Sequence, residues 1–464
     1  MFRKLFTLKQ VLKFLLGAAA LTFMSSCSSN SDNKKESESI RKLDSLFSSI
    51  DESGGWMGSI SIFQDGEEVY NRAFGYANVE DNVKNDKETK FRIGSVTDVY
   101  TATIIMKLVE SGKISLDTKL NDYFPEIMKS PRITVEDLLR HRSGIFNLLM
   151  DLTYWSYYHL PISEEVLYHK IVDFGLVDEP GKKSQFSSSN YILLGMMAEK
   201  IEGKSYSDIL DSLICKPLGL KNTYVGSSIS IKDNEASSYY DRLPRWNLAK
   251  ETDLSTAIGE ASIVSTPTEV NLFLTKLFDG KVLSDSSVDK MKQVVDGFSL
   301  GMQTLDREYP NLGVVGNIDG FNTEVVYFTD KDRNVVVSYF SNGSSSSSID
   351  IMGYALAVYF NKEDSLPEFK KYINLSDQEM EKYEGVYSNS QYSTTFEIVK
   401  DTAEHCLMFV SSNDKSDPSY IGCYKNGEFS VQMSDEEVPI EFTIFPENGT
   451  LRLSNGMELK KVKS

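Results

Sequence analysis

The stretch from Phe91 to Tyr100 is the part of this 464-residue chain that most restricts how the chain can fold. Apolar residues follow it at helical spacing, namely Ile104, Ile105, Leu108 and Val109. Ser111-Gly112 then predicts the end of that helix. Ser95 is therefore expected at a helix N-terminus, where free backbone N–H groups and the positive end of the dipole favour developing negative charge. The position suits a nucleophilic serine, and it equally suits a serine that only caps the helix.

The residues around Ser95 resemble those of the serine β-lactamase and penicillin-binding-protein superfamily, in particular its class C β-lactamase-like branch. The shared phrase is Phe91-Arg92-Ile93-Gly94-Ser95. In the family a lysine three residues after the serine helps to remove the hydroxyl proton, whereas here that position is Asp98. Three further segments resemble the family in the same order: 133–144, 190–195 and 216–223. The resemblance runs from about residue 40 to residue 360.

The resemblance implies an α/β (α+β) domain with a β-lactamase-like/transpeptidase-like fold, in which an antiparallel sheet packs against a helical subdomain. The residue pattern agrees with this at both ends of the domain. Residues 57–63 and 67–74 are strand-like runs joined by Asp65-Gly66, a strong hairpin signal. Strand-like runs return at 324–328 and 335–340. In the family, the late strands join the early hairpin in one sheet.

The character of the sequence changes after Leu366. Short alternating runs follow at 394–399, 406–410, 429–433, 440–445 and 451–453. Asn-Gly turns separate the later runs, which predicts a small all-β domain, and relatives of this kind suggest a lipocalin-like barrel. We therefore predict a β-lactamase-like serine hydrolase domain over 40–365, beginning with an amphipathic helix, and a small β-barrel-like domain over 366–464.

The first residues form a targeting segment rather than part of the fold. A basic start precedes an apolar run from Phe14 to Met24 that is too short to span a bilayer. Ser25-Ser26-Cys27 resembles the lipobox of bacterial lipoproteins, which implies a signal peptide over 1–27 and lipidation of Cys27. The alternative is an ordinary secretory signal with an incidental cysteine. Residues 28–39 are expected to form a polar tether, and the mature protein to lie in the bacterial cell envelope, lipid-anchored on the periplasmic face or the cell surface.

Composition limits the partners that the chain can bind. The formal net charge is −18, so a polyanion would be repelled and nucleic-acid binding is not expected. The four cysteines and four histidines show no metal-ligand spacing, and no metal or other cofactor is predicted. Cys406 and Cys423 fall in neighbouring predicted strands, which leaves a disulfide between them open.

Serine catalysis needs a nucleophile, a base that activates it and donors for the oxyanion. The first family motif keeps Ser95 but places Asp98 where the lysine belongs. A carboxylate with an ordinary pKa near ~4 is a weak acceptor for a serine proton. Since Ser-x-x-Asp before an apolar run is itself a capping-box pattern, we interpret Ser95 and Asp98 mainly as a helix cap.

The second family motif, Tyr-x-Asn, is located by the phrase that begins at Tyr191. That register places Phe186 at the tyrosine position and Ser188 at the asparagine position. Phe186 fills the volume of a tyrosine but neither donates nor accepts a proton. An alternative register uses Ser188-Ser189-Asn190 as the Ser-x-Asn motif of class A β-lactamases.

The third family motif, His-x-Gly or Lys-Thr-Gly, falls on Val314-Val315-Gly316. Val314 replaces the His or Lys, so the polar group is absent. Gly316 and Asn317 are expected to line a cleft and to present backbone N–H groups, or else to form a strand where another segment passes close.

Three defective motifs within an otherwise complete frame lead to our first hypothesis: a β-lactamase-related envelope lipoprotein that is catalytically impaired but retains a cleft for a peptidoglycan-derived or other small envelope ligand. A second is an active serine hydrolase (D,D-peptidase, esterase or β-lactamase-like) in which Ser95 uses a relocated base, for which Lys182 and Lys183 are candidates. A third is an envelope scaffold that acts through its C-terminal β domain. His141 is expected to stabilise a turn, and the aromatic cluster at 154–158 either binds a ligand or packs.

Overall fold

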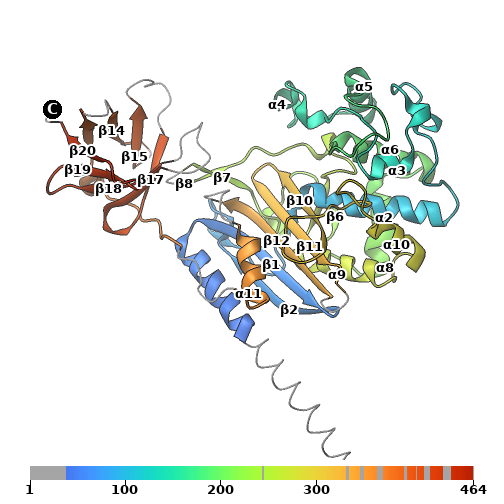
Figure 1. The fold of residues 1–464 in the computed structure, drawn as a ribbon, viewed down its shortest axis with the longest axis horizontal. Helices are drawn as coiled ribbons and strands as arrows, with labels where there is room; N and C mark the ends of the chain where they lie inside the picture. Colours follow the sequence, from blue (N-terminus) through green and yellow to red (C-terminus); the bar gives the residue numbers. More distant parts are fainter. Residues whose placement is uncertain are drawn as a thin grey trace, which may run out of the picture. The chain divides into compact units, whose positions relative to one another are not determined.

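The structure is a computed structural model that describes residues 38–242, 245–330, 334–344, 350–362, 369–390, 394–403, 405–411, 419–431 and 440–462 (Figure 1). The predicted signal peptide, Cys27 and nearly all of the predicted tether lie outside these residues. Contacts divide the chain into two units, one with residues 1–49 and 350–368 and one with residues 50–349 and 369–464. The predicted N-terminal helix is present over residues 38–53. The predicted domain limits stay predictions.

The second unit contains a five-stranded antiparallel sheet in the order β10-β11-β12-β1-β2 (Figure 1). Its strands are β1 (Trp56–Gln64), β2 (Glu67–Phe74), β10 (Asn311–Ile318), β11 (Phe321–Phe328) and β12 (Val335–Ser344). Strand β1 pairs with β2 on one side and with β12 on the other, so the early hairpin and the late strands form one sheet. This confirms the expectation from the resemblance. Strand β10 lies at the edge of the sheet.

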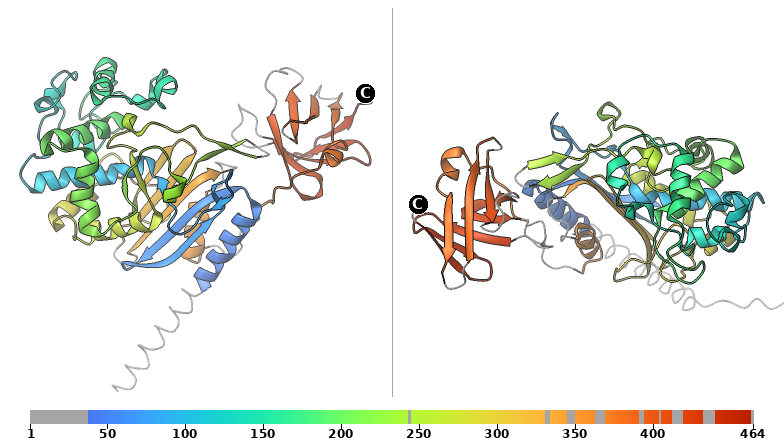
Figure 2. Two further views of the ribbon diagram at one scale, coloured as in Figure 1. Left: turned by 180° about the vertical axis from the view of Figure 1, so that it is seen from behind. Right: turned by 90° about the horizontal axis from the view of Figure 1, so that it is seen from above.

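Helices from the middle of the chain gather beside this sheet (Figures 1 and 2). They are α2 (Thr97–Glu110), α3 (Val135–Leu139), α4 (Tyr154–Tyr157), α5 (Glu164–Phe174), α6 (Ser188–Glu202), α7 (Tyr206–Leu210), α8 (Lys216–Leu218), α9 (Pro267–Phe278) and α10 (Asp285–Lys292). Helix α9 is fixed to the sheet by Asn271, whose amide donates to Ser61 O at 2.9 Å and accepts from Ser338 Oγ at 2.7 Å. Helices α11 (Ile351–Tyr359) and α12 (Asp377–Met380) follow later in the chain.

Short strands position the segment that contains Ser95. Strand β5 (Phe91–Arg92) pairs with β9 (Ile263–Ser265), which also pairs with β6 (Tyr224–Val225). Two further small pairs are β3 (Tyr76–Asn78) with β4 (Val83–Lys84), and β7 (Tyr239–Arg242) with β8 (Arg245–Leu248). Ile93 N donates to Ile263 O at 3.0 Å just beyond the end of β5. A segment about 170 residues further along the chain thus lies directly beside Ser95.

The C-terminal part is a closed antiparallel barrel of eight strands, which confirms the predicted small β domain. The strands are β13 (Gly385–Asn389), β14 (Thr394–Asp401), β15 (Cys406–Ser411), β16 (Ser419–Cys423), β17 (Glu428–Val431), β18 (Ile440–Phe445), β19 (Thr450–Leu453) and β20 (Glu458–Lys461). Pairing of β13 with β20 closes the barrel. The core contains Phe396, Phe409, Phe429 and Phe442. The sequence pattern gave no alternating run for β13, β16 or β20, although Cys423 of β16 was placed in a predicted strand.

Cys406 and Cys423 lie on paired strands, as predicted, but no disulfide joins them. The alternation of side chains explains this outcome. Leu407 and Phe409 belong to the barrel core, so their neighbour Cys406 faces the other side of β15. Cys423 itself belongs to the core. A disulfide would need the two side chains on one face of the sheet.

Among the described residues, none of the helices combines the length and the apolar character required to cross a membrane.

Candidate active site

Ser95 lies at the start of the helical segment, as the sequence predicts. A 3₁₀ turn over Gly94–Val96 leads directly into α2. Gly94 has a φ of +53°, and a Cβ there would lie 2.9 Å from Asn317 N. A glycine is therefore needed where this turn contacts strand β10. The Ser95 side chain is buried, with 8% of the residue exposed.

The Ser95 hydroxyl donates a hydrogen bond to Glu260 Oε1 at 2.8 Å. The interpretation of Ser95 and Asp98 as a helix cap is wrong, because neither the 3₁₀ turn nor α2 has a side-chain cap. The capping pattern is purely local, whereas the partner that takes the hydroxyl stands 165 residues away. The serine proton therefore points at a carboxylate and not at the backbone.

Glu260 is a site residue that the sequence reasoning missed. Only 3% of it is exposed, and burial raises its pKa to about 7, although the hydrogen bond from Ser95 acts in the lowering direction. No ion pair reaches Glu260 within the part of the chain that the structure describes. Its signal in the sequence was a single acidic residue within the small and apolar run 257–264.

The loop that bears Glu260 is fixed against α2 and α6. Thr101 Oγ1 donates to Gly259 O at 2.6 Å, and Ile263 N donates to Thr97 Oγ1 at 3.3 Å. Gly259 has a φ of +73° and faces Gly195 of α6 so closely that a Cβ on Gly195 would lie 3.0 Å from the Cα of Gly259. The loop reaches this position because both residues lack a side chain.

Asp98 lies one turn into α2 from Ser95, at the position of the family lysine. Only 4% of it is exposed, and its Oδ1 has no hydrogen-bond partner among the described residues. Burial, and then the charge of Glu260, raises the pKa of Asp98 well above its usual range. A carboxyl of this kind resists ionisation and supplies no positive charge, so Asp98 does not replace the lysine.

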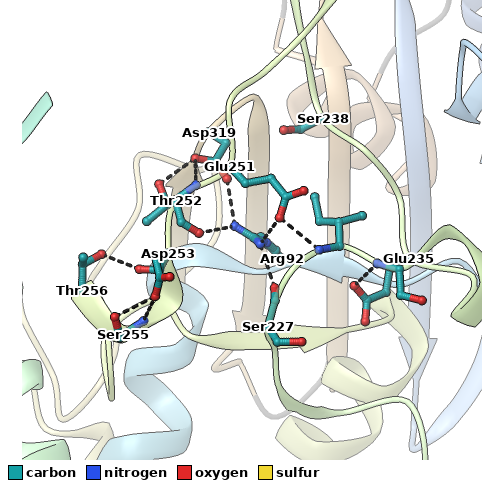
Figure 3. Close-up of polar contacts among 12 residues, drawn as sticks. Arg92, Ser227, Glu235, Ser238, Glu251, Thr252, Asp253, Ser255, Thr256 and Asp319 are labelled. Atoms are coloured by element: carbon teal, nitrogen blue, oxygen red, sulfur yellow. Dashed lines mark hydrogen bonds and ion pairs between the residues drawn. The ribbon is translucent and has the colours of Figure 1, made fainter. Parts of the chain in front are cut away.

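Arg92 joins three other segments to the strand that precedes Ser95 (Figure 3). Its guanidinium donates to Thr252 O at 2.8 Å and Ser227 O at 2.8 Å, and it pairs with Asp319 at 3.1 Å and Glu251 at 2.8 Å. The carboxylate of Asp319 also accepts from Thr252 N and Thr252 Oγ1 at 2.9 and 2.6 Å. The segment before Ser95, the loop that leads to Glu260 and the β10–β11 turn are thereby held together.

The second motif contributes no side chain to Ser95. Phe186 is partly exposed, and its ring packs on His141 with centroids 4.8 Å apart. Ser188 Oγ donates to Asn147 Oδ1 at 2.6 Å. In the alternative Ser-x-Asn register, Asn190 is buried and its Oδ1 accepts a hydrogen bond from Ser143 Oγ at 2.5 Å. The polar side chains of Ser188, Asn147, Asn190 and Ser143 therefore stabilise the turn and the start of α6.

His141 belongs to this turn, as expected from the resemblance. Its Nδ1 accepts from Ser187 N at 3.2 Å, and burial lowers its pKa to about 3. The ring is therefore neutral near pH 7 and packs among Phe186, Tyr191 and Phe298.

The third motif places backbone next to Ser95. Val314 is buried and pairs with Val325 of β11, so no polar side chain stands at the His/Lys position. At Gly316 a Cβ would lie 2.4 Å from Ile93 O and 3.0 Å from Ser95 N. The strand and the nucleophile segment are thus in direct backbone contact, as the glycine interpretation predicts. Strand β10 therefore brings the backbone of Gly316 and Asn317 to the start of the helix.

The other candidate bases form contacts elsewhere. Lys182 and Lys183 are exposed and pair with Asp178 at 3.3 and 3.0 Å. Arg142 pairs with Asp296 and donates to Gly181 O. Lysines were the candidates for the relocated base, but the group that accepts the hydrogen bond from Ser95 is the carboxylate of Glu260.

The aromatic cluster at 154–158 packs internally and also reaches the site. Tyr154 lies within ring contact of Trp155, Tyr157 and Tyr158. Burial, and then the charge of Glu260, raises the pKa of Tyr154 to about 12, and its hydroxyl is hydrogen-bonded to Thr256. Its hydroxyl therefore stays protonated near Glu260.

Comparison with known proteins places these observations in a family. The model of the family described as Beta-lactamase matches residues 44–365. The putative penicillin-binding protein PbpX of Bacillus subtilis is 25% identical over 348 residues, which cover 72% of this chain and 86% of that protein. Teichoic acid D-alanine hydrolase of Staphylococcus aureus is 25% identical over 319 residues, 65% of this chain and 77% of that protein.

Solved structures give the same result for the fold. D-amino acid amidase from Ochrobactrum anthropi SV3, complexed with L-phenylalanine amide, aligns with a TM-score of 0.60 and 26% identity over 69% of this chain and 98% of that chain. FmtA from Staphylococcus aureus aligns with a TM-score of 0.60 and 22% identity over 73% of this chain and 93% of that chain, a likeness of fold alone. The predicted fold class is confirmed.

Proposed function

Because the chain belongs to the β-lactamase family, we propose that it is a serine acyl hydrolase in which Ser95 is the nucleophile. The observation that carries the proposal is the orientation of the Ser95 hydroxyl, which donates to a buried carboxylate at 2.8 Å instead of capping the helix. A nucleophilic serine requires an acceptor for its proton within hydrogen-bond reach. The helix start and the adjacent backbone of β10 supply the setting in which an oxyanion is stabilised.

We propose D-aminoacyl esters or amides of the cell envelope as the substrate class. Two proteins that this chain resembles are named for such substrates, a teichoic acid D-alanine hydrolase and a D-amino acid amidase. Both reactions transfer an acyl group to water, and they differ only in the leaving group. A peptidoglycan-derived ligand, as expected from the sequence, belongs to the same chemistry when it carries a D-alanyl group.

Covalent labelling tests this proposal. Intact protein incubated with a fluorophosphonate is expected to gain the mass of one phosphonyl group, and release of D-alanine from a D-alanyl ester is expected to be measurable. Ser95→Ala removes the nucleophilic oxygen, so both signals should disappear while thermal unfolding stays cooperative. If the protein forms no adduct and releases no D-alanine, the proposal fails. The prediction of catalytic impairment with a retained ligand cleft would then stand in its place.

We also propose that the protein is lipid-anchored in the cell envelope through Cys27. The support is the sequence Ser25-Ser26-Cys27 after a short apolar run. Cells fed a radiolabelled fatty acid should label the mature chain, and Cys27→Ala should abolish the label and release the protein from the membrane fraction. If the chain with an intact Cys27 remains unlabelled, the lipid-anchor proposal fails and the alternative of an ordinary secretory signal is supported.

A further inference from the structure

We propose that Glu260 is the general base that takes the proton of Ser95 and the general acid that returns it to the leaving group. This inference rests on the proposed function and names the residue that does the work of the missing lysine. The site is then a serine–glutamate pair. Ser95 belongs to the first family motif, whereas Glu260 belongs to none of the three motifs. No lysine, tyrosine or histidine side chain is required for the proton transfer.

The geometry fits direct proton transfer. A general base must lie within about 2.6–3.2 Å of the atom whose proton it removes, and Ser95 Oγ and Glu260 Oε1 are 2.8 Å apart. Both side chains are shielded from solvent, so the proton has one destination. The bond from Thr101 Oγ1 to Gly259 O holds the residue next to Glu260 to the same helix that begins after Ser95.

The charges around Glu260 support the same role. Two titratable groups interact electrostatically with it, Asp98 from α2 and Tyr154 from α4. Burial and the charge of Glu260 raise the pKa of Asp98 well above its usual range, and they raise the pKa of Tyr154 to about 12. The pKa of Glu260, about 7, makes it a far stronger acceptor than an ordinary carboxylate near neutral pH. The buried setting thus corrects the weakness that a carboxylate base would have in water.

The reaction balances with these groups alone. Ser95 Oγ forms a bond to the acyl carbon as its proton passes to the Glu260 carboxylate. The bond from the acyl carbon to the leaving oxygen or nitrogen then breaks, and the Glu260 carboxylic acid protonates that atom. In the second half, Glu260 takes a proton from water, the resulting hydroxide attacks the acyl carbon, and Ser95 leaves with the proton from Glu260.

Other proton carriers are poorly placed for this role. Lys182 and Lys183 pair with Asp178, and the His141 nitrogen that lies toward α6 accepts from the backbone of Ser187. Asp98 is buried, and its Oδ1 has no hydrogen-bond partner among the described residues, whereas the Ser95 hydroxyl donates to Glu260.

A pH–rate profile tests the inference. In the wild-type chain, kcat/KM for a D-alanyl ester should rise with pH through an acid limb centred near 7 and depend on Ser95. Glu260→Gln should lower kcat by about 100- to 10,000-fold and remove that limb, with KM little changed. Glu260→Asp, which keeps a carboxyl but withdraws it from Ser95, should retain the limb at a reduced rate. The surface variant Glu179→Gln, at a residue that pairs with Arg132, should behave as wild type.

The outcomes separate this inference from the proposed function. Ser95-dependent hydrolysis that persists in Glu260→Gln with the same acid limb would overturn the role of Glu260 and leave the hydrolase intact. Hydrolysis or labelling that persists in Ser95→Ala would overturn the proposed function itself. If Glu260→Gln fails to fold, Glu260→Asp decides: a limb that is retained at a lower rate supports the inference, and a wild-type rate overturns it.

Discussion

Arg92→Met is expected to lower the free energy of unfolding by about 3–5 kcal/mol, because it leaves a buried carboxylate without its cation. The Arg92 and Asp319 side chains are each only 2% exposed. The arginine also donates to Thr252 O and Ser227 O, two carbonyls that would lose a partner. Urea unfolding of the wild type and the variant, followed by far-UV circular dichroism, measures the difference.

The same variant should be more strongly destabilised at pH 8 than at pH 5. Burial raises the pKa of Asp319 above its usual value while Arg92 acts in the lowering direction, so removing Arg92 raises the pKa further. An acid whose folded pKa exceeds its unfolded pKa binds more protons in the folded state, so stability falls as pH rises through the folded value. Adding Asp319→Asn should recover part of the loss at pH 8. Arg132→Met breaks an exposed pair and should cost much less; an equal loss would contradict the role assigned to Arg92.

Gly316→Ala is expected to reduce kcat by at least about 100-fold, the scale of losing one oxyanion donor. The added Cβ would lie 2.4 Å from Ile93 O, 2.5 Å from Thr323 Oγ1 and 3.0 Å from Ser95 N. Two of these atoms belong to the backbone and cannot move aside, so β10 must shift away from the nucleophile. Overpacking of this kind also costs about 1–3 kcal/mol of stability. Ester hydrolysis and urea unfolding of the same preparation measure both effects.

Gly181→Ala is the matched control for that variant. Gly181 has a φ of +77°, and no atom lies within 4 Å of the position that an alanine methyl group would take, so the substitution adds backbone strain without a collision. Its stability should fall by about 1–2 kcal/mol, and its hydrolysis rate should not change. A Gly316→Ala protein that hydrolyses the ester at the wild-type rate would show that contact between β10 and Ser95 is not needed for the reaction.

The fold class followed from the resemblance of the residues around Ser95 to a known family, and local signals added individual elements. The strands on either side of Asp65-Gly66 follow from alternation with a period of two residues. The helix after Ser95 follows from apolar spacing with a period of 3.6 residues. The small β domain was predictable from alternating runs, but β13, β16 and β20, which have four or five residues each, gave no such run. Whether Cys406 and Cys423 point to the same face of the sheet depends on the exact position of each residue along its strand. A shift of one residue reverses the face, and knowing only that two strands are neighbours does not fix that position.

The site was only half predictable for a different reason. Ser95 and Gly316 follow from short phrases, and the structure places them at the start of a helical segment and on a strand, as expected. Glu260 follows from no phrase, because its role depends on one tertiary contact across 165 residues. The capping interpretation of Ser95 failed for the same reason, since a local pattern says nothing about a distant partner that competes for the hydroxyl.

The close packing of Gly195 against Gly259 makes this site fragile to a substitution that usually helps. An alanine within a long helix normally favours helix formation over glycine by nearly 1 kcal/mol. At Gly195, a methyl group would meet the Cα of Gly259 at 3.0 Å, next to Glu260. A Gly195→Ala substitution that strengthens α6 would therefore move Glu260 away from Ser95. Helix stability and catalytic rate would then be in conflict at a buried residue that does not contact the substrate.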